Sequence, residues 1–397
     1  MKKNIVFVIP SLTAGGAEKS LVNLLNTIDY SNYNVDLVLL HKKGIFLSML
    51  PKEVTVLDLN SNYKTFCKEL VSSCLEFLIQ GKFNLIYHRI SFFAKNKFQK
   101  NKAVAEQNSW QNIQKSLNKL PNKYDAAIGF LEKSSIYFTV DKIDAKVKIG
   151  WIHTTYSSSK MNSKFDMLYF EKCNAIIAVS PDCEADLKNN FPTLKNKFKT
   201  IYNIVSSTTI HNLSDKNSDD LLFLNSENSI VTVARLSPEK GIDLAVEASK
   251  ILLEKNLNFK WFVIGDGQER ENLEIKIKFF NLQNHFYLIG LKQNPYPYLK
   301  LCTLYVQPSQ YEGKSMAIEE AKILCKPIIV TNFTTAKDQI NNSVNGIIAQ
   351  MNQESLANEI LEVLQNKKLQ EKLSLNLSKE TLGTEDEINK LYEIINE

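Results

Sequence analysis

Residues 311–329, YEGKSMAIEEAKILCKPII, carry two carboxylates, Glu312 and Glu320, separated by seven residues. A strand-like run, TLYVQ at 303–307, precedes them, and an apolar helical pattern follows Ser315, which we expect to be the N-cap. In an open parallel sheet, ligands bind outside the carboxyl ends of the strands. We therefore expect both carboxylates to face such a crevice, where they can accept hydrogen bonds from sugar hydroxyls. The alternative is an ordinary helix start, since the helix dipole also favours glutamate there.

A glycine-rich loop, SLTAGGAEKS, follows the first predicted strand at residues 4–10 and precedes a predicted helix at 17–25. Gly15 and Gly16 permit positive backbone torsion and close approach of a ligand. A helix N-terminus with bare N–H groups suits a phosphate, although a plain tight turn is the alternative. The dinucleotide fingerprint G-x-G-x-x-G is absent, so no dinucleotide site is expected.

Two cations, Arg235 and Lys240, occupy the loop RLSPEKG after a predicted strand at 229–234. A pyrophosphate needs such charge neutralisation, and arginine adds a bidentate fork. The same charges would stabilise a departing diphosphate, whereas the alternative is a basic turn. Asp266, in the loop after the predicted strand 261–264, has no aspartate two residues away, so no D-x-D metal site is expected.

His153 ends a predicted strand at 147–153, again at a carboxyl edge. A histidine at a strand end is often a satisfied polar residue, and that alternative stays open. The other four histidines are not singled out by a comparable position in the sequence.

Strands and helices alternate along the chain, which indicates doubly wound α/β architecture. At 397 residues, two domains are expected. The polar segment 212–228 suggests the linker region. We predict an N-terminal domain at 1–205, a C-terminal domain at 206–380, and a last helix within 381–397 that crosses back. Other strands are predicted at 35–40, 54–57, 85–88, 125–130, 175–179, 285–289 and 328–331, with a helix at 65–79 and another at 242–253.

Composition is that of a soluble protein, with 44% hydrophobic and 23% charged residues. No run approaches the roughly 18 apolar residues that span a bilayer. Pro10 interrupts the apolar start before a signal-peptide core forms, so a first strand is expected there. The six cysteines form no C-x-x-C pair, which favours reduced thiols in a cytosolic protein.

Positive charge gathers between Arg89 and Lys123, where eight Lys or Arg residues face one acid, Glu106. Aromatic residues interleave with these charges, a combination that suits a membrane interface. The stretch predicts contact with anionic lipid headgroups or with a pyrophosphate-linked acceptor, and a solvated basic helix is the alternative. No nucleic-acid motif accompanies the charge, so no nucleic-acid partner is expected.

Taken together, these motifs resemble the retaining nucleotide-sugar glycosyltransferases of family four, the glycosyl transferases group 1. The resemblance rests on Y-E-G and E-A around the two glutamates, P-x4-G-G-A-E in the first loop and V-A-R-L-x-x-x-K-G in the second half. It also includes T-I-Y-N at 200–203 and N-G at 345–346, so it covers nearly the whole chain. Lys314 departs from the family pattern, which usually has an aromatic residue there.

The resemblance implies the GT-B fold, an α/β architecture of two Rossmann-like domains facing a cleft. It also implies roles for the site residues. Glu320 would hold ribose hydroxyls, Arg235 and Lys240 the diphosphate, and Glu312 the sugar. His153 would lie beside the donor sugar. Further substrate contacts are assigned to Gly15, Gly16, Gly267, Leu291, Gly313, Lys314 and Ser315.

The implied reaction is transfer from a nucleotide diphosphate sugar, expected to be UDP-linked, to a sugar or polyprenyl-linked acceptor with retention of configuration. No metal and no cofactor are expected. The implied setting is bacterial surface polysaccharide synthesis, covering capsule, exopolysaccharide and lipopolysaccharide, on the cytoplasmic face of the plasma membrane. Two alternatives stay open: a non-catalytic sugar-nucleotide-binding partner of a glycosyltransferase complex, and a GT-B sugar-nucleotide epimerase. A phosphorylase of this fold would need a pyridoxal-phosphate lysine motif, which is not found.

Overall fold

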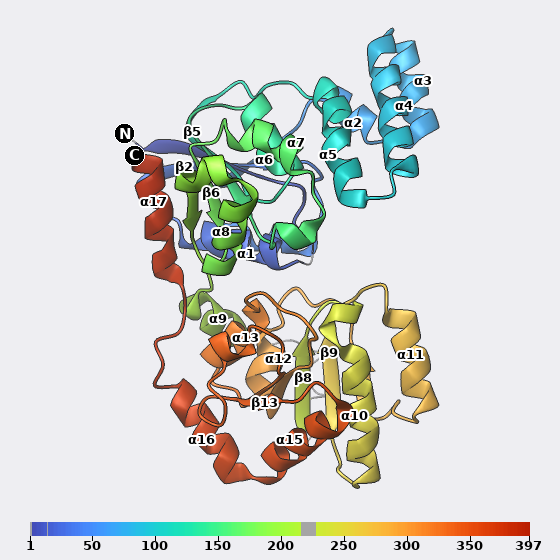
Figure 1. Ribbon diagram of the computed structural model, residues 1–397, viewed down its shortest axis with the longest axis vertical. Helices are drawn as coiled ribbons and strands as arrows, with labels where there is room; N and C mark the ends of the chain where they lie inside the picture. The colour runs from blue at the N-terminus through green and yellow to red at the C-terminus, as the bar shows by residue number, and fades with distance from the viewer. Residues whose placement is uncertain (1, 14, 216–227) are drawn as a thin grey trace. The chain divides into compact units, whose positions relative to one another are not determined.

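The computed structural model describes residues 2–13, 15–215 and 228–397. The chain forms two compact units, each built on one parallel sheet (Figure 1). Unit 1 comprises the described residues of Met1–Ile204 together with Thr384–Glu397, and unit 2 is Val205–Gly383. Each unit is described by itself below.

Unit 1 contains a seven-stranded sheet in the order β3-β2-β1-β4-β5-β6-β7, and every neighbouring pair is parallel. The order reverses between β1 and β4, which is a topological switch point. The strands are β1 Lys3–Ile9, β2 Tyr33–Leu39, β3 Val54–Leu57, β4 Lys123–Gly129, β5 Asp144–Ile152, β6 Ala175–Ala178 and β7 Phe198–Thr200. The helices are α1 Gly16–Thr27, α2 Ser61–Phe66, α3 Leu70–Ile79, α4 Phe83–Phe98, α5 Lys102–Ile113, α6 Ser134–Lys142, α7 Ser163–Phe170, α8 Pro181–Asn190 and α17 Ile388–Asn396.

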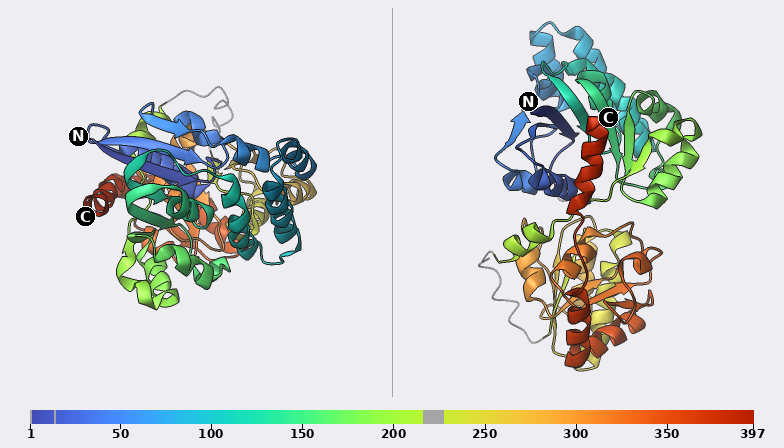
Figure 2. Two further views of the ribbon diagram at one scale, coloured as in Figure 1. Left: turned by 90° about the horizontal axis from the view of Figure 1, so that it is seen from above. Right: turned by 90° about the vertical axis from the view of Figure 1, so that its left-hand side faces the viewer.

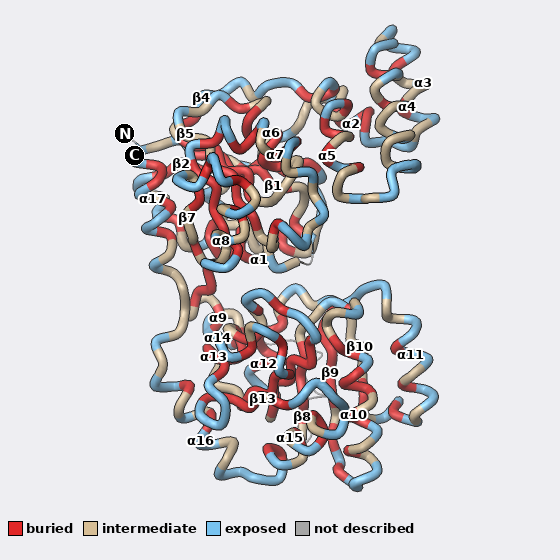
Figure 3. Tube along the Cα trace, in the orientation of Figure 1, coloured by how far each residue is buried: buried red, intermediate tan, exposed pale blue. Residues whose placement is uncertain are grey.

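Strand β1 shows why an unbroken apolar run forms the centre of this sheet. Successive side chains of a strand point to opposite faces, so both faces here need an apolar partner. Ile5, Phe7 and Ile9 belong to one buried cluster, and Val6 and Val8 belong to the other. The two helical layers therefore cover both faces of the sheet, and its inner strands β1, β4 and β6 are largely buried (Figure 3).

A helical insert, α2 to α5, separates β3 from β4 and corrects two sequence predictions. The predicted strand at 85–88 is wrong, because these residues lie inside helix α4. Leu85 and Arg89 are buried while Phe83 and Tyr87 are exposed, which is helical rather than alternating spacing. The predicted helix at 65–79 is interrupted, and α2 and α3 are separate helices.

The last helix, α17, belongs to unit 1, so the chain returns to the unit in which it began (Figure 2). Leu391 is buried in the same cluster as β1. The ring of Tyr392 stacks on Tyr33 with 4.8 Å between centroids. Near the two ends of the chain, Lys3 Nζ donates a hydrogen bond to Asn396 Oδ1 at 2.6 Å.

Unit 2 contains a six-stranded parallel sheet in the order β10-β9-β8-β11-β12-β13. Its switch point lies between β8 and β11. The strands are β8 Ser229–Val233, β9 Lys260–Ile264, β10 Phe286–Leu288, β11 Leu304–Gln307, β12 Ile328–Thr331 and β13 Ile347–Ala349. The helices are α9 Ser207–Ser214, α10 Ile242–Glu254, α11 Arg270–Phe279, α12 Tyr296–Leu301, α13 Met316–Ile323, α14 Ala336–Gln339, α15 Gln353–Gln365 and α16 Lys367–Leu377.

The predicted pair of Rossmann-like α/β domains is confirmed by these two parallel sheets. Within the predicted linker, residues 216–227 lie outside the described residues, and α9 extends to Ser214. All six cysteines are free thiols. In the described part of the chain, no helix is long and apolar enough to cross a bilayer.

Candidate active site

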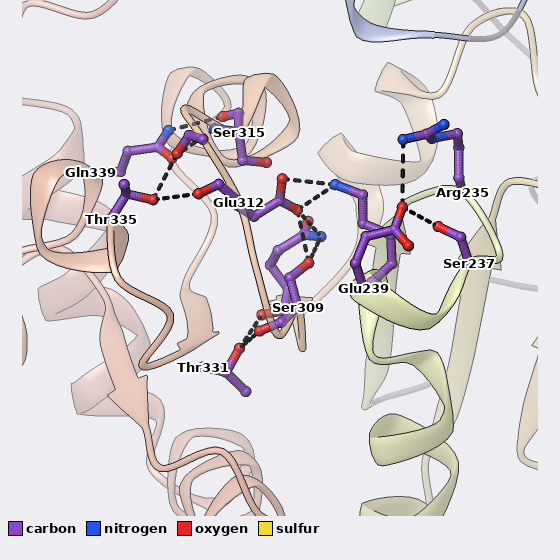
Figure 4. Close-up of polar contacts among 12 residues, drawn as sticks. Arg235, Ser237, Glu239, Ser309, Glu312, Ser315, Thr331, Thr335 and Gln339 are labelled. Atoms are coloured by element: carbon purple, nitrogen blue, oxygen red, sulfur yellow. Dashed lines mark hydrogen bonds and ion pairs between the residues drawn. The ribbon is translucent and has the colours of Figure 1, made fainter. Parts of the chain in front are cut away.

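Glu312 lies in the loop between β11 and α13, at the carboxyl end of a central strand of unit 2 (Figure 4). Its residue surface is 7% exposed, so the carboxylate needs partners inside the protein. Lys240 Nζ lies 2.7 Å from both carboxylate oxygens. Ser309 Oγ donates to Oε1 at 2.8 Å, and Gln307 Nε2 donates to the same oxygen at 3.2 Å. Among the described residues, Oε1 has three donors and Oε2 has one, so Oε2 retains accepting capacity for a ligand hydroxyl.

Gly241 explains how Lys240 reaches Glu312 from a loop 72 residues away in sequence. This glycine has φ 62°, and a Cβ there would lie 2.0 Å from the carbonyl oxygen of Pro308. Only glycine fits both the left-handed torsion and this close approach. The backbone N–H of Gln310 donates to the carbonyl of Glu239 at 2.9 Å, which ties the two loops together again.

Arg235, the second predicted cation, is paired with a carboxylate that the sequence analysis missed. Its Nη2 lies 3.5 Å from Glu239 Oε1, and Ser237 Oγ donates to the same oxygen at 2.6 Å. The pKa of Glu239 is lowered by that Ser237 hydrogen bond and by Arg235, against the opposing effect of burial. The Arg235 side chain remains 65% exposed. Arg235 therefore pairs with a carboxylate of its own loop, whereas Lys240 pairs with Glu312 of the loop after β11.

Glu320 lies in α13 and is 1% exposed, so its carboxylate is more deeply buried than that of Glu312. The hydroxyl of Tyr296 donates to Glu320 Oε1 at 3.3 Å. Tyr296 comes from α12, and its pKa is raised by burial and by the neighbouring Glu320 charge. The spacing of the two glutamates placed Glu320 on the helix, but it carried no information about this tyrosine.

Ser315 occupies the N-cap position of α13, as predicted, but its side chain makes no capping hydrogen bond. The amide of Gln339 holds Ser315 instead: Oε1 accepts the Ser315 N–H at 2.8 Å and Nε2 donates to its carbonyl at 2.9 Å. Thr335 Oγ1 lies 2.9 Å from the carbonyl oxygen of Glu312 and 2.7 Å from that of Gly313 (Figure 4). Lys314 is exposed, and the backbone on either side of it is held by side chains that follow β12.

The loop after β9 places Gly267 against the loop after β8. A Cβ on Gly267 would lie 2.3 Å from the carbonyl oxygen of Leu236, so a larger residue would force the loops apart. Asp266 accepts a hydrogen bond from Arg270 Nε at 2.9 Å, and this contact holds the pKa of Asp266 below its usual value. Leu291 follows β10 and is exposed.

In unit 1, the glycine loop begins helix α1 at its amino end, with Gly15 at the N-cap position. Gly15 has φ −146°, and Gly16 is not among the glycines with positive φ, so neither uses the positive torsion that glycine permits. A Cβ on Gly16 would meet nothing within 4 Å, whereas a Cβ on Gly15 would lie 2.1 Å from Glu18 Oε2, so the Glu18 carboxylate lies at this end of the helix. Ala14 lies outside the described residues.

His153 follows β5, and Glu132 follows the adjacent strand β4. Glu132 Oε1 accepts the backbone N–H of His153 at 2.5 Å. The His153 ring packs against Phe130, with 4.8 Å between centroids, and stacks on Trp151. Neither ring nitrogen has a hydrogen-bond partner among the described residues. Burial lowers the pKa of His153 to about 3 and raises the pKa of Glu132, so the imidazole is neutral at physiological pH.

Comparison with known proteins adds a family match. Residues 214–380 match the family model described as Glycosyl transferases group 1. Poly(ribitol-phosphate) alpha-N-acetylglucosaminyltransferase of Staphylococcus aureus is 25% identical over 228 residues, 55% of this chain and 44% of that protein. For the first curated relatives, the chain spans about half of their length or less.

Two further comparisons extend over nearly the whole chain. One relative is GalNAc-alpha-(1->4)-GalNAc-alpha-(1->3)-diNAcBac-PP-undecaprenol alpha-1,4-N-acetyl-D-galactosaminyltransferase of Campylobacter jejuni, 24% identical, covering 91% of this chain and 89% of that one. The crystal structure of Anabaena Alr3699/HepE in complex with UDP-glucose superposes with a TM-score of 0.69 at 15% identity, covering 99% of each chain. The family match and the shared architecture confirm the sequence resemblance: residues 214–380 belong to the glycosyl transferases group 1, and the chain has the GT-B fold.

Proposed function

We propose that the protein is a retaining, metal-independent hexosyltransferase that moves a sugar from a UDP-sugar to a sugar or lipid-linked sugar acceptor in bacterial surface polysaccharide synthesis. The observation that carries this proposal is the Lys240–Glu312 pair. It joins the loops after β8 and β11, the adjacent strands at the switch point of unit 2. Ligands of open α/β sheets bind at such a point.

The comparisons support the donor and acceptor classes. Anabaena HepE binds UDP-glucose in its crystal structure, and the Campylobacter relative is named for a diphospho-undecaprenol-linked acceptor. Each of these two proteins aligns with more than nine tenths of this chain. A UDP-sugar donor and a polyprenyl-linked acceptor are therefore the pair to test first.

In the proposed reaction, Arg235 and Lys240 bind the diphosphate, and Glu312 accepts a hydroxyl of the transferred sugar. The bond from the anomeric carbon to the diphosphate oxygen breaks while the bond from that carbon to the acceptor oxygen forms on the same face. The acceptor proton passes to the departing phosphate oxygen. The two cations stabilise the charge that grows on the diphosphate, so they act most strongly in the transition state.

His153 is assigned to the donor sugar and Glu320 to the ribose, as the family resemblance implies. With a pKa of about 3, His153 is a neutral hydrogen-bonding group and not a cation at working pH. Gly15 and Gly16, at the amino end of α1, are assigned to a phosphate or a substrate hydroxyl, which would displace the Glu18 carboxylate from this end.

A transfer assay with a panel of UDP-, GDP-, ADP- and CMP-sugars tests the proposal. Incorporation of sugar into a polyprenyl-diphosphate-linked acceptor, with the anomeric configuration of the donor, is the expected result. Nucleotide-sugar binding without transfer or hydrolysis would instead identify a non-catalytic partner. Conversion of the free nucleotide sugar to its epimer would identify an epimerase.

The Arg235→Ala substitution should weaken UDP binding by about 1.5–3 kcal/mol, the usual worth of a hydrogen bond to a charged group. Arg235 must leave Glu239 to reach the diphosphate. That exposed ion pair is worth only about 0–1 kcal/mol, which is less than the hydrogen bond to the diphosphate contributes. Titration calorimetry measures the change. Lys250→Ala, which removes another exposed ion pair in unit 2, serves as the control. Equal UDP affinity in wild type and Arg235→Ala would remove Arg235 from the diphosphate site.

A further inference from the structure

Helices α3 and α4 of the insert expose a large apolar surface, which we call the hairpin face. Half of the eighteen exposed large hydrophobic residues in the described chain lie between residues 71 and 98. The two helices lie side by side in unit 1 (Figure 1), and their exposed segments appear in pale blue in Figure 3. The hairpin face consists of Val71, Leu75, Leu78, Ile79, Phe83, Tyr87, Ile90, Phe93 and Phe98.

The spacing of these residues makes both helices amphipathic. Val71, Leu75 and Leu78 follow the i, i+4, i+7 pattern of one helical stripe, and α4 repeats the pattern from Phe83 to Ile90. The other side of the pair is buried in a small cluster formed by Phe66, Phe77 and Leu85. The hairpin face is therefore not needed for the core of the insert. Contiguous exposed apolar patches of this kind mark protein or membrane contacts.

Charge decides between those partners. Residues 77–105 contain five Lys, the buried Arg89 and no Asp or Glu, and the acid of α3, Glu76, is paired with Lys68. Lys97 Nζ lies 5.6 Å from the ring centroid of Phe93 and 5.9 Å from that of Phe98, so cations and apolar side chains share one surface. A second copy of this chain, paired through a two-fold axis, would bring these cations against their equivalents. An anionic lipid surface instead neutralises them while accepting the apolar side chains.

We propose that the α3–α4 hairpin is a membrane-docking surface that binds anionic phospholipid. Helices of 10 and 16 residues lie in the headgroup region rather than span the bilayer. Phe83 and Tyr87 insert beside the acyl chains, and Lys97 and Lys100 contact the headgroups. This inference goes beyond the transfer reaction, because it holds whichever sugar and acceptor the enzyme uses.

The apolar contribution is tested by sedimentation of the full chain with phosphatidylcholine vesicles that contain phosphatidylglycerol. Ile79→Glu/Phe83→Glu changes side chains that are 86% and 67% exposed and should lower binding at least tenfold, since two apolar contacts are replaced by anions. Ile275→Glu/Phe279→Glu is the matched control, because these residues of α11 are 68% and 77% exposed. The control should bind vesicles as the wild type does.

The charge contribution is tested by changing Lys95, Lys97, Lys100 and Lys102 together to Gln. Each neutralised lysine near an anionic surface should cost about fivefold in affinity, so the quadruple variant should bind anionic vesicles far more weakly. The matched control changes four exposed lysines of unit 2, Lys367, Lys368, Lys372 and Lys379, to Gln. Salt should release the wild type from these vesicles, since surface charge is screened.

Several results would overturn the docking proposal. One is that the wild type binds vesicles equally well with and without phosphatidylglycerol, and another is that Ile79→Glu/Phe83→Glu binds as its control does. A third is that sedimentation equilibrium shows a wild-type dimer that is a monomer in Ile79→Glu/Phe83→Glu. UDP titration of every variant shows whether unit 2 is intact. A protein that transfers sugar but ignores vesicles would refute the docking surface and leave the proposed reaction standing.

A second inference comes from the side chains that hold the Glu312 loop. Thr335 and Gln339 follow β12, and their hydrogen bonds fix the backbone of Glu312, Gly313 and Ser315. Gln339 is buried, and its Nε2 also donates to Glu319 Oε1 at 2.8 Å. We infer that Thr335 and Gln339 are positioning residues that set where Glu312 meets the sugar. This inference rests on the proposed function.

Thr335→Val keeps the shape of the side chain but removes its hydroxyl. We expect kcat/KM for the UDP-sugar to fall about fivefold, the usual effect of one neutral hydrogen bond. UDP affinity should stay unchanged, because the diphosphate is held by Arg235 and Lys240. Thr335→Ser restores the hydroxyl and should restore kcat/KM, and Thr334→Val, at an exposed neighbour, is the control.

If Thr335→Val lowers the affinities for UDP and for the UDP-sugar together, Thr335 has a general structural role and the positioning role is overturned. An unchanged kcat/KM in an active enzyme would also overturn it. A wild type that transfers no sugar at all would instead refute the proposed function, so the two failures are distinguishable.

Discussion

Replacing Lys240 with alanine is expected to lower the free energy of unfolding of unit 2 by about 3 kcal/mol. The Lys240 and Glu312 side chains are 17% and 8% exposed, and the loss of one partner leaves the other charge buried without a counterion. Breaking a buried pair in this way costs about 3–5 kcal/mol, and the residual exposure of Lys240 favours the lower end. Urea-dependent hydrogen exchange of the β8 and β11 amides reports on unit 2 separately from unit 1.

The double variant Lys240→Ala/Glu312→Gln tests the physical cause of this loss. It should be more stable than Lys240→Ala by about 1–3 kcal/mol, because the unpaired carboxylate is gone. Lys250→Ala, which breaks an exposed pair with Glu254, should change stability by less than about 1 kcal/mol. A Lys240→Ala protein as stable as Lys250→Ala would show that the Lys240–Glu312 contact does not hold the two loops together.

Glu312→Gln is expected to reduce kcat for sugar transfer by about 100–1000-fold, the scale of losing one transition-state interaction. The substituted amide keeps the size of the side chain but carries no charge. The negative charge of the native carboxylate orients Lys240 and strengthens the hydrogen bond to the sugar, so both effects are lost. UDP affinity should be unchanged or higher, because Lys240 no longer has to leave a carboxylate to reach the diphosphate. A steady-state transfer assay and UDP calorimetry on the same protein separate the two effects.

The matched control for this prediction is Glu359→Gln, which neutralises a half-buried carboxylate on α15. It should retain wild-type kcat and UDP affinity. If Glu312→Gln instead transfers sugar at the wild-type rate, the carboxylate has no catalytic role. If UDP binding is lost along with transfer, Glu312 acts through the nucleotide site and not through the sugar.

The hairpin illustrates how a short apolar run can mislead. LIYH at 85–88 has the composition of a buried strand, and only the longer pattern of exposed Phe83, Tyr87 and Ile90 shows the helical period. The predicted basic stretch, residues 89–123, overlaps the hairpin face only at 89–98, and its first member, Arg89, is buried. Charge depends on composition alone, whereas the face that a side chain presents depends on the secondary structure.

The sequence by itself determined the alternation of strands and helices, because continuous apolar runs and helical periodicity are local properties. It also determined which residue types follow each strand, and hence that Arg235, Lys240, Glu312 and His153 lie at carboxyl edges. It showed that the first glycine pair permits positive torsion, but the glycine that adopts it beside the site is Gly241, where the loop touches Pro308.

Only the tertiary structure decided the partners of these groups. Lys240 and Glu312 are 72 residues apart, and Tyr296 and Glu320 are 24 apart, so no local pattern links the members of either pair. No sequence motif marks Ser309, Thr335 and Gln339. They hydrogen-bond to the Glu312 loop because the parallel pairing of β11 with β12 brings the loops after these strands together. A buried charge must find its counterion and donors wherever the fold places them, and that requirement is satisfied in space rather than along the chain.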